Sequence, residues 1–123
     1  MDNLRYLYVS DTGKYEVRKY QLKDKNGTLV AGGNGQGNGI NQLHTPTYIY
    51  VDQQQNVYVS DSSNHRVMCW TQGAKQGSVI VGGNGSGAAA NQFNGSGALN
   101  FDQHGNLYVV DFLNFRVQRF SLK

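Results

Sequence analysis

The hydrophobic residues of this chain occur in short runs, separated by segments rich in Gly, Asn, Asp and Gln. Runs of this length bounded by turn residues are typical of β-strands. No segment combines the three- and four-residue apolar spacing of an amphipathic helix with caps at both ends, so we predict no helix. In the middle of the chain the pattern predicts four strands, over residues 48–51, 57–60, 66–71 and 78–81.

Apolar and polar residues do not alternate within these runs. The third predicted strand contains Val67-Met68-Cys69-Trp70, and the fourth contains Val79-Ile80-Val81. An antiparallel sheet with one face in water normally alternates between apolar and polar residues. These strands therefore predict sheets that are covered on both faces, as in a stack of sheets about 10 Å apart.

An internal repeat runs along the whole chain with an offset of 50 residues. Tyr8-Val9-Ser10-Asp11 recurs as Tyr58-Val59-Ser60-Asp61 and again as Tyr108-Val109-Val110-Asp111. The same offset carries the glycine-rich segment 32–35 onto 82–85. Four short strands in a period of this length are typical of a β-propeller blade and not of a helical solenoid.

The repeat predicts an all-β fold, a partial β-propeller of about two and a half blades of four-stranded antiparallel sheets. Residues 1–43 would form an incomplete first blade with its connection, residues 44–93 a complete second blade with its connection, and residues 94–123 an incomplete third blade. All three would belong to one propeller domain. Because propellers close with roughly 4–8 blades, the remaining blades would come from a longer parent chain or from a second copy in a homodimer.

The segment Tyr58–Val67 resembles the NHL repeat, whose central motif is matched here by Asn64-His65 followed by Arg66-Val67. The third copy keeps Asn and Arg but has Phe115 in place of His, and the first copy keeps only the Asp and the Val. The resemblance covers nearly the whole chain and implies a six-bladed, TolB-like propeller. A kelch propeller fits less well, since kelch repeats place a glycine pair after the second strand, where this chain has Ser-Asp.

The repeated polar residues predict a structural role. They are Asp11, Asp61, Asp111, Asn64 and Asn114. We expect each Asp to accept hydrogen bonds from backbone N–H groups of the loop that follows it, as in an Asx turn. The Asn before the third strand of a blade tolerates a left-handed backbone conformation, and we expect that its side chain can form hydrogen bonds locally.

Successive strands of a blade alternate in direction, so the loops between its second and third strands should lie on the same face as the connections between blades. Exposed aromatic residues in loops often mark recognition surfaces. The candidate recognition face consists of His65, Arg66, Phe112, Leu113, Phe115 and Arg116. Packing over a neighbouring blade is the alternative role for Phe115 and His65.

Composition and motifs argue against several kinds of functional site. The net charge of +3 is a weak basic bias, and the single cysteine, Cys69, permits no intrachain disulfide. The glycine-rich runs are not followed by Gly-Lys-Ser/Thr and a helix, as a phosphate-binding loop would require. His44, His65 and His104 fall at three different positions of the repeat, so we expect no ring of metal ligands and no cofactor. No apolar run approaches the roughly 20 residues that span a membrane.

The resemblance implies a protein-interaction or scaffold module with a protein partner and no catalysis of its own. The first alternative is an RNA-binding NHL domain of the tripartite-motif ubiquitin-ligase type, in which Arg66 and Arg116 would contact phosphates beside stacking aromatic residues. The second alternative is a metal-dependent propeller enzyme that resembles an amidating lyase or a lactonase. The sequence makes no prediction about the compartment.

Overall fold

The structure, a computed structural model, describes residues 6–122 as β-strands joined by turns and longer connections. The strands are β1 (Tyr6–Asp11), β2 (Glu16–Gln21), β3 (Thr28–Gly32), β4 (Pro46–Val51), β5 (Val57–Asp61), β6 (Arg66–Trp70), β7 (Ser78–Gly82), β8 (Ser96–Phe101), β9 (Asn106–Asp111) and β10 (Arg116–Ser121). The four strands expected in the middle of the chain are present as β4 to β7, each with bounds within two residues of the prediction.

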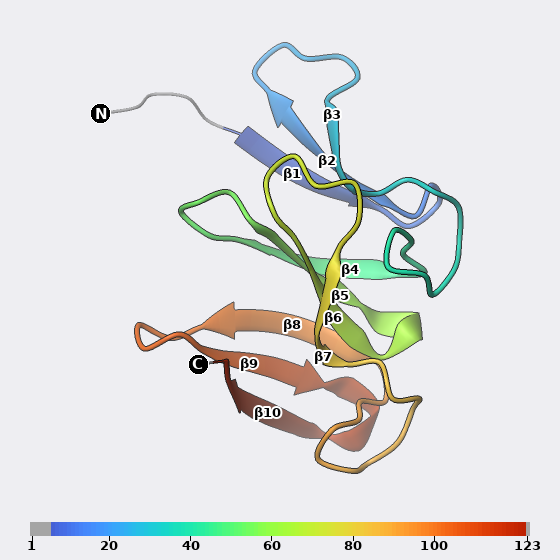
Figure 1. Ribbon diagram of the computed structural model, residues 1–123, viewed down its shortest axis with the longest axis vertical. Coiled ribbons are helices and arrows are strands. Elements are labelled where there is room, and N and C mark those ends of the chain that lie inside the picture. Colours follow the sequence, from blue (N-terminus) through green and yellow to red (C-terminus); the bar gives the residue numbers. More distant parts are fainter. Residues whose placement is uncertain (1–5, 123) are drawn as a thin grey trace.

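The strands form three antiparallel sheets that are stacked one on another (Figure 1). The first sheet has the order β1-β2-β3, the middle sheet β4-β5-β6-β7, and the third sheet β10-β9-β8. In each sheet, strands that follow one another in the sequence are paired, which is the arrangement of a propeller blade. The prediction of an all-β partial propeller is therefore confirmed.

Two single turns of 3₁₀ helix, η1 (Ser62–Asn64) and η2 (Phe112–Asn114), occur in loops where no helix was predicted. Each turn ends at a residue in the left-handed conformation, with φ of 53° at both His65 and Phe115. Asn64 and Asn114 lie in the helical turn just before this residue, and their side chains form local hydrogen bonds to Asp61 and Asp111. Among residues 6–122 no helix is long and apolar enough to cross a lipid bilayer.

The hydrophobic core lies between the sheets in two clusters. The first joins the first and middle sheets and contains Val17, Ala31, Leu43, Val57, Val59, Met68 and Trp70. The second joins the middle and third sheets and contains Val67, Phe93, Leu107 and Val109. Leu43 and Phe93 come from the connections between sheets and are fully buried. Each connection therefore contributes one large apolar side chain to the core between the sheets that it joins.

Glycine is required where the last strand of the first or the middle sheet ends and the connection to the next sheet begins. Gly32 and Gly82 end the last strands of the first and middle sheets with φ of +67° and +80°. A Cβ atom at Gly32 would overlap the carbonyl oxygen of Tyr15, and one at Gly82 would overlap that of His65. Only glycine allows this close approach in a left-handed conformation, which explains why the glycine pair recurs with the repeat.

The turn between the first and second strands of each of the last two sheets is built around an aspartate. In the third sheet, Asp102 Oδ1 accepts hydrogen bonds from the backbone N–H groups of His104 and Asn106, both at 2.9 Å. Its Oδ2 accepts from Asn106 Nδ2 at 3.0 Å and from the Tyr108 hydroxyl at 3.2 Å. These hydrogen bonds, those from Asn106 above all, lower the pKa of Asp102 to about 2.

The stability of the fold is expected to fall in acid in a way that depends on Asp102. A carboxyl group with a folded-state pKa of about 2 and an unfolded value near 3.9 favours folding above about pH 4, and this contribution is lost as the pH falls toward 2. Urea unfolding at pH 5, 3 and 2 should show that Asp102→Asn is less stable than wild type at pH 5 and that the gap closes in acid.

The matched control is Gln103→Ala in the same turn, which removes no titrating group and should give a difference that does not change with pH. A gap between wild type and Asp102→Asn that is constant from pH 5 to pH 2 would contradict the assignment.

Candidate functional site

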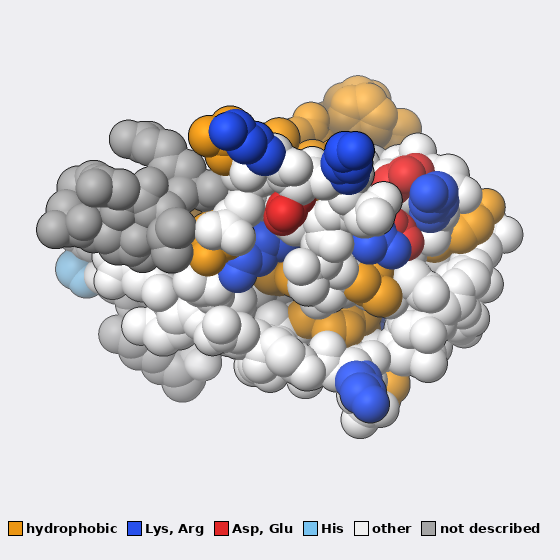
Figure 2. Space-filling model, turned by 90° about the horizontal axis from the view of Figure 1, so that it is seen from above, with side chains coloured by type: hydrophobic (Ala, Val, Ile, Leu, Met, Phe, Trp, Pro, Cys, Tyr) orange, Lys and Arg blue, Asp and Glu red, His pale blue; other side chains and the backbone are white. Residues whose placement is uncertain are grey.

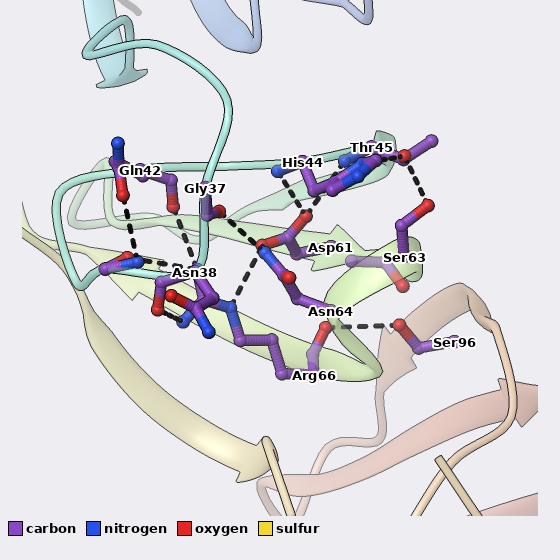
Figure 3. A network of polar contacts seen from close by, with 12 residues as sticks. Gly37, Asn38, Gln42, His44, Thr45, Asp61, Ser63, Asn64, Arg66 and Ser96 are labelled. Carbon is purple, nitrogen blue, oxygen red and sulfur yellow. Dashed lines mark hydrogen bonds and ion pairs between the residues drawn. The ribbon is translucent and has the colours of Figure 1, made fainter. Parts of the chain in front are cut away.

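The repeated polar residues of the middle sheet form a network with the connection that leads into this sheet (Figure 3). Asp61, at the end of β5, is fully buried. Its Oδ1 accepts hydrogen bonds from the backbone N–H groups of His44 at 2.9 Å and Thr45 at 3.0 Å. Its Oδ2 accepts from Asn64 Nδ2 at 2.8 Å and from Arg66 Nε at 2.9 Å. The carboxylate therefore joins the loop after β5 to the segment that enters β4.

Arg66 extends the network to the rest of the connection. Only 4% of the residue is exposed. Besides Asp61, its guanidinium donates to the carbonyl oxygens of Asn38 at 3.0 Å, Gly39 at 3.1 Å and Gln42 at 2.9 Å. Buried charges are stable only when they are paired and hydrogen-bonded, and this guanidinium satisfies both conditions. It holds the connection against the loop side of the middle sheet.

The third sheet repeats this arrangement around Asp111. Its Oδ1 accepts from the N–H of Asn94 at 2.8 Å, and its Oδ2 accepts from Asn114 Nδ2 at 3.0 Å and Arg116 Nε at 2.6 Å. Burial alone would raise the pKa of Asp111, but the hydrogen bonds from Asn114 and Asn94, together with Arg116, outweigh burial and lower it. The Arg116 side chain is 32% exposed, because no further sheet covers it among residues 6–122.

The first sheet lacks this network. Among residues 6–122, Asp11 Oδ1 accepts hydrogen bonds from the N–H groups of Gly13 at 2.9 Å and Lys14 at 3.1 Å and from no other group, which is the Asx turn that the sequence predicted. Glu16 stands where the other two copies have Arg, and it pairs with Arg18 instead. At Asp61 and Asp111 the expectation of an Asx turn was wrong, since these carboxylates accept from the incoming connection and from the Asn and Arg side chains.

The structure places the six residues of the candidate recognition face in two different environments. Arg66 is inside the network, which corrects the expectation that it lies on the surface. His65 also makes an internal contact, since its Nδ1 accepts a hydrogen bond from the N–H of Gly95 in the third sheet at 3.0 Å. Arg116 is partly exposed but paired with Asp111.

The other three residues of that face are exposed. Phe112 and Leu113 lie in η2, and Phe115 follows it. Phe115 is 93% exposed and occupies the position that His65 has in the middle sheet. The apolar side chains are therefore the most exposed members of the candidate face.

A recess of about 460 Å³ lies beside Phe112, between the first strands of the middle and third sheets. It is lined by Thr47, Tyr48, Ser62, Gly95, Ser96, Gly97, Ala98, Val110 and Phe112. The repeat explains the hollow, because Gly97 and Ala98 stand where the middle sheet has Thr47 and Tyr48. This site was not predicted from the sequence, although the change from Thr and Tyr to the much smaller Gly and Ala at aligned repeat positions was a signal that could have found it.

The hydroxyl groups at the edge of the recess are already engaged. Thr47 Oγ1 and Ser62 Oγ are 2.6 Å apart, and the Ser62 hydroxyl also donates to the carbonyl oxygen of Ser96. Phe112 is 66% exposed, and half of Tyr48 is exposed. The recess therefore offers aromatic and small apolar surface, which suits an apolar side chain better than an ion.

The remaining residues with reactive side chains are placed apart from this recess. His44 Nε2 lies 2.9 Å from the Gln36 amide nitrogen, and His44 Nδ1 lies 2.9 Å from Thr45 Oγ1. Cys69 is buried in β6, and burial raises the pKa of its thiol. Residues 6–122 contain no group of three His, Cys, Asp or Glu side chains that could hold a metal ion.

Comparison with known proteins agrees with this architecture. Residues 43–70 match the model of the NHL repeat. The fold is similar to a solved auxiliary nutrient binding protein from Bacteroides thetaiotaomicron, with a TM-score of 0.71 and 18% sequence identity. The match covers 93% of this chain and 34% of that protein, so this chain spans about a third of its length. No curated protein sequence matches the chain.

The two arginines of the networks should differ in their importance for stability. Arg66→Met leaves the Asp61 carboxylate buried without its ionic partner, which is expected to cost about 3–5 kcal/mol. Arg116→Met also removes the ionic partner of a buried carboxylate, Asp111, but the Arg116 side chain is itself partly exposed, so we expect a smaller loss of stability. Urea unfolding of both variants at neutral pH, followed by circular dichroism, measures the difference. Equal losses for the two variants would show that burial of the network does not determine its contribution.

Proposed function

We propose that this chain, a partial β-propeller of the NHL-repeat family, is a protein-interaction module with no catalysis of its own. The binding site is the recess between Tyr48 and Phe112, and the ligand is an apolar side chain presented by a protein partner. The proposal rests on one observation: on the loop face, most polar side chains are hydrogen-bonded within the chain, whereas the apolar side chains are exposed.

The polar residues of this face are occupied within the chain. Asp61, Asn64 and Arg66 bind one another and the connection, so they serve the stability of the propeller. The apolar residues Phe112 and Leu113 have no comparable burial. Exposed apolar side chains beside a hollow on a rigid sheet scaffold are typical of protein-binding surfaces.

The same placement weakens the RNA-binding alternative. Phosphate contacts require arginines that are free to reach a nucleic acid, whereas Arg66 is buried and Arg116 is paired with Asp111. A filter-binding titration at two salt concentrations separates the two roles, because the affinity of a protein for RNA falls steeply as salt is raised. Retention of RNA at low salt that is lost at higher salt would favour RNA as the ligand.

The protein-binding role is tested with two variants of equal chemistry. Phe112→Ser removes the aromatic wall of the recess, whereas Ile40→Ser removes an exposed apolar residue of the connection between the first and middle sheets. Wild type and both variants are immobilised, incubated with nuclease-treated lysate of the source cells, and compared by quantitative mass spectrometry. We expect at least one protein to be bound by wild type and Ile40→Ser and reduced tenfold or more on Phe112→Ser.

Circular dichroism shows whether Phe112→Ser keeps the fold, which we expect because its side chain is exposed. An identical set of bound proteins on all three surfaces would overturn the proposal.

A further inference from the structure

The first and third sheets each have one face that no other sheet covers among residues 6–122. The internal repeat shows what these faces are built to contact, since each of their residues has an equivalent in a sheet that is covered. Burial at equivalent positions can therefore be compared directly.

The uncovered face of the third sheet carries Val117. Its equivalents Val17 and Val67 are both fully buried, and each belongs to the core cluster that joins its sheet to the next one. Val117 is 62% exposed. The third sheet therefore presents the same central valine as the other two sheets, but within the described part of the chain no following sheet covers it.

The uncovered face of the first sheet carries the complementary residues. Val17 shares a cluster with Val57 and Val59, and Val67 shares one with Leu107 and Val109. The equivalents of these residue pairs in the first sheet are Leu7 and Val9, and Leu7 is 64% exposed. A hollow of about 550 Å³ lies over this face, lined in part by Tyr6, Leu7, Val9, Tyr20 and Leu22.

Figure 2 looks down on the first sheet and shows hydrophobic side chains lying between lysine, arginine and acidic side chains. The charged residues around a second hollow on this face include Lys14, Glu16, Arg18 and Lys25. Arg18 stands at the repeat position of Met68, which is fully buried. This face is thus more polar than its buried equivalents, as expected of an interface that also has to be stable in water.

We propose that a second copy of this chain covers both faces, with the third sheet of each copy packed on the first sheet of its partner. The contact is head-to-tail, and two copies related by a twofold axis form two equal junctions that close a ring. Three sheets from each copy give a ring of six sheets. Propellers close with roughly 4–8 blades, so six lies within that range. The inference does not depend on the ligand of the recess.

The equivalent residues just before β2, β6 and β10 support the direction of the contact. In the first sheet this residue, Tyr15, lies edge-on to His44 at a centroid distance of 6.5 Å, just before the middle sheet begins. In the middle sheet it is His65, which accepts the hydrogen bond from Gly95 at the start of the third sheet. Phe115 is the equivalent residue of the third sheet, and its ring would reach the partner in the same direction.

The junction between copies is smaller than the contacts within the chain. Among residues 6–122, no counterpart of the buried side chains of Leu43 and Phe93 is available at the junction, because these come from the connections between sheets. The sheets that meet there have three strands each among the described residues, whereas the middle sheet has four. We therefore expect a dimer that dissociates on dilution.

The experiment places opposite charges on the two faces. Leu7→Asp and Val117→Lys change exposed residues, so each variant is expected to fold, which circular dichroism checks. Sedimentation velocity over a hundredfold range of concentration should show wild type passing from monomer to dimer. Each variant alone should stay a monomer at the highest concentration, because every junction would contain one charge facing apolar residues.

An equimolar mixture of the two variants discriminates between arrangements. It should restore the dimer, since one junction of the ring is then native, and at the other junction the introduced carboxylate of one variant faces the introduced ammonium group of the other. Wild type that stays monomeric throughout would overturn the proposal. So would Leu7→Asp that dimerises like wild type, which indicates a face-to-face contact of the third sheets, or a mixture that does not dimerise.

Discussion

The structure depends on the hydrogen bonds that join the middle and third sheets to the connections that precede them. The buried carboxylate of Asp61 accepts hydrogen bonds from the backbone N–H groups of His44 and Thr45, and Arg66 donates hydrogen bonds to carbonyl oxygens of the same connection. Short strands paired in small sheets have few other ways to fix the position of one sheet against the next. The polar network therefore sets the geometry in which the apolar side chains between the sheets can pack.

Polar and apolar parts of the contact between sheets support each other. The carboxylate and the arginine hold the backbone of the connection that carries Leu43 or Phe93 into the core. In turn, the packed sheets exclude water from Asp61 and Arg66, which strengthens the ion pair. Where the cover is missing, at Arg116, the guanidinium still binds Asp111 and two carbonyl oxygens of the connection, but the arginine side chain is about one-third exposed.

The residues that we propose to bind partners are those at which the third copy of the repeat differs from the middle copy. The middle copy has Ser62, Ser63 and His65 in its loop, and the third copy has Phe112, Leu113 and Phe115 at the same positions. Ser62 and His65 bind the third sheet through Ser96 and Gly95, whereas the three apolar residues are exposed. Departures from the repeat thus coincide with the surfaces for which we propose partners, since a residue that no longer holds the fold is free to bind something else.

The sequence by itself determined the fold class, the four strands of the middle sheet and the structural importance of the repeated Asp and Asn positions. It could do so because strand length, turn residues and an unbroken 50-residue offset can all be read directly from the order of the residues. Only the tertiary structure decided which atoms the polar side chains bind, that Arg66 is buried, and that a recess lies beside Phe112. These properties depend on contacts between residues far apart in the sequence, such as the hydrogen bond from Ser62 to Ser96, and no local pattern encodes the position of one sheet against the next.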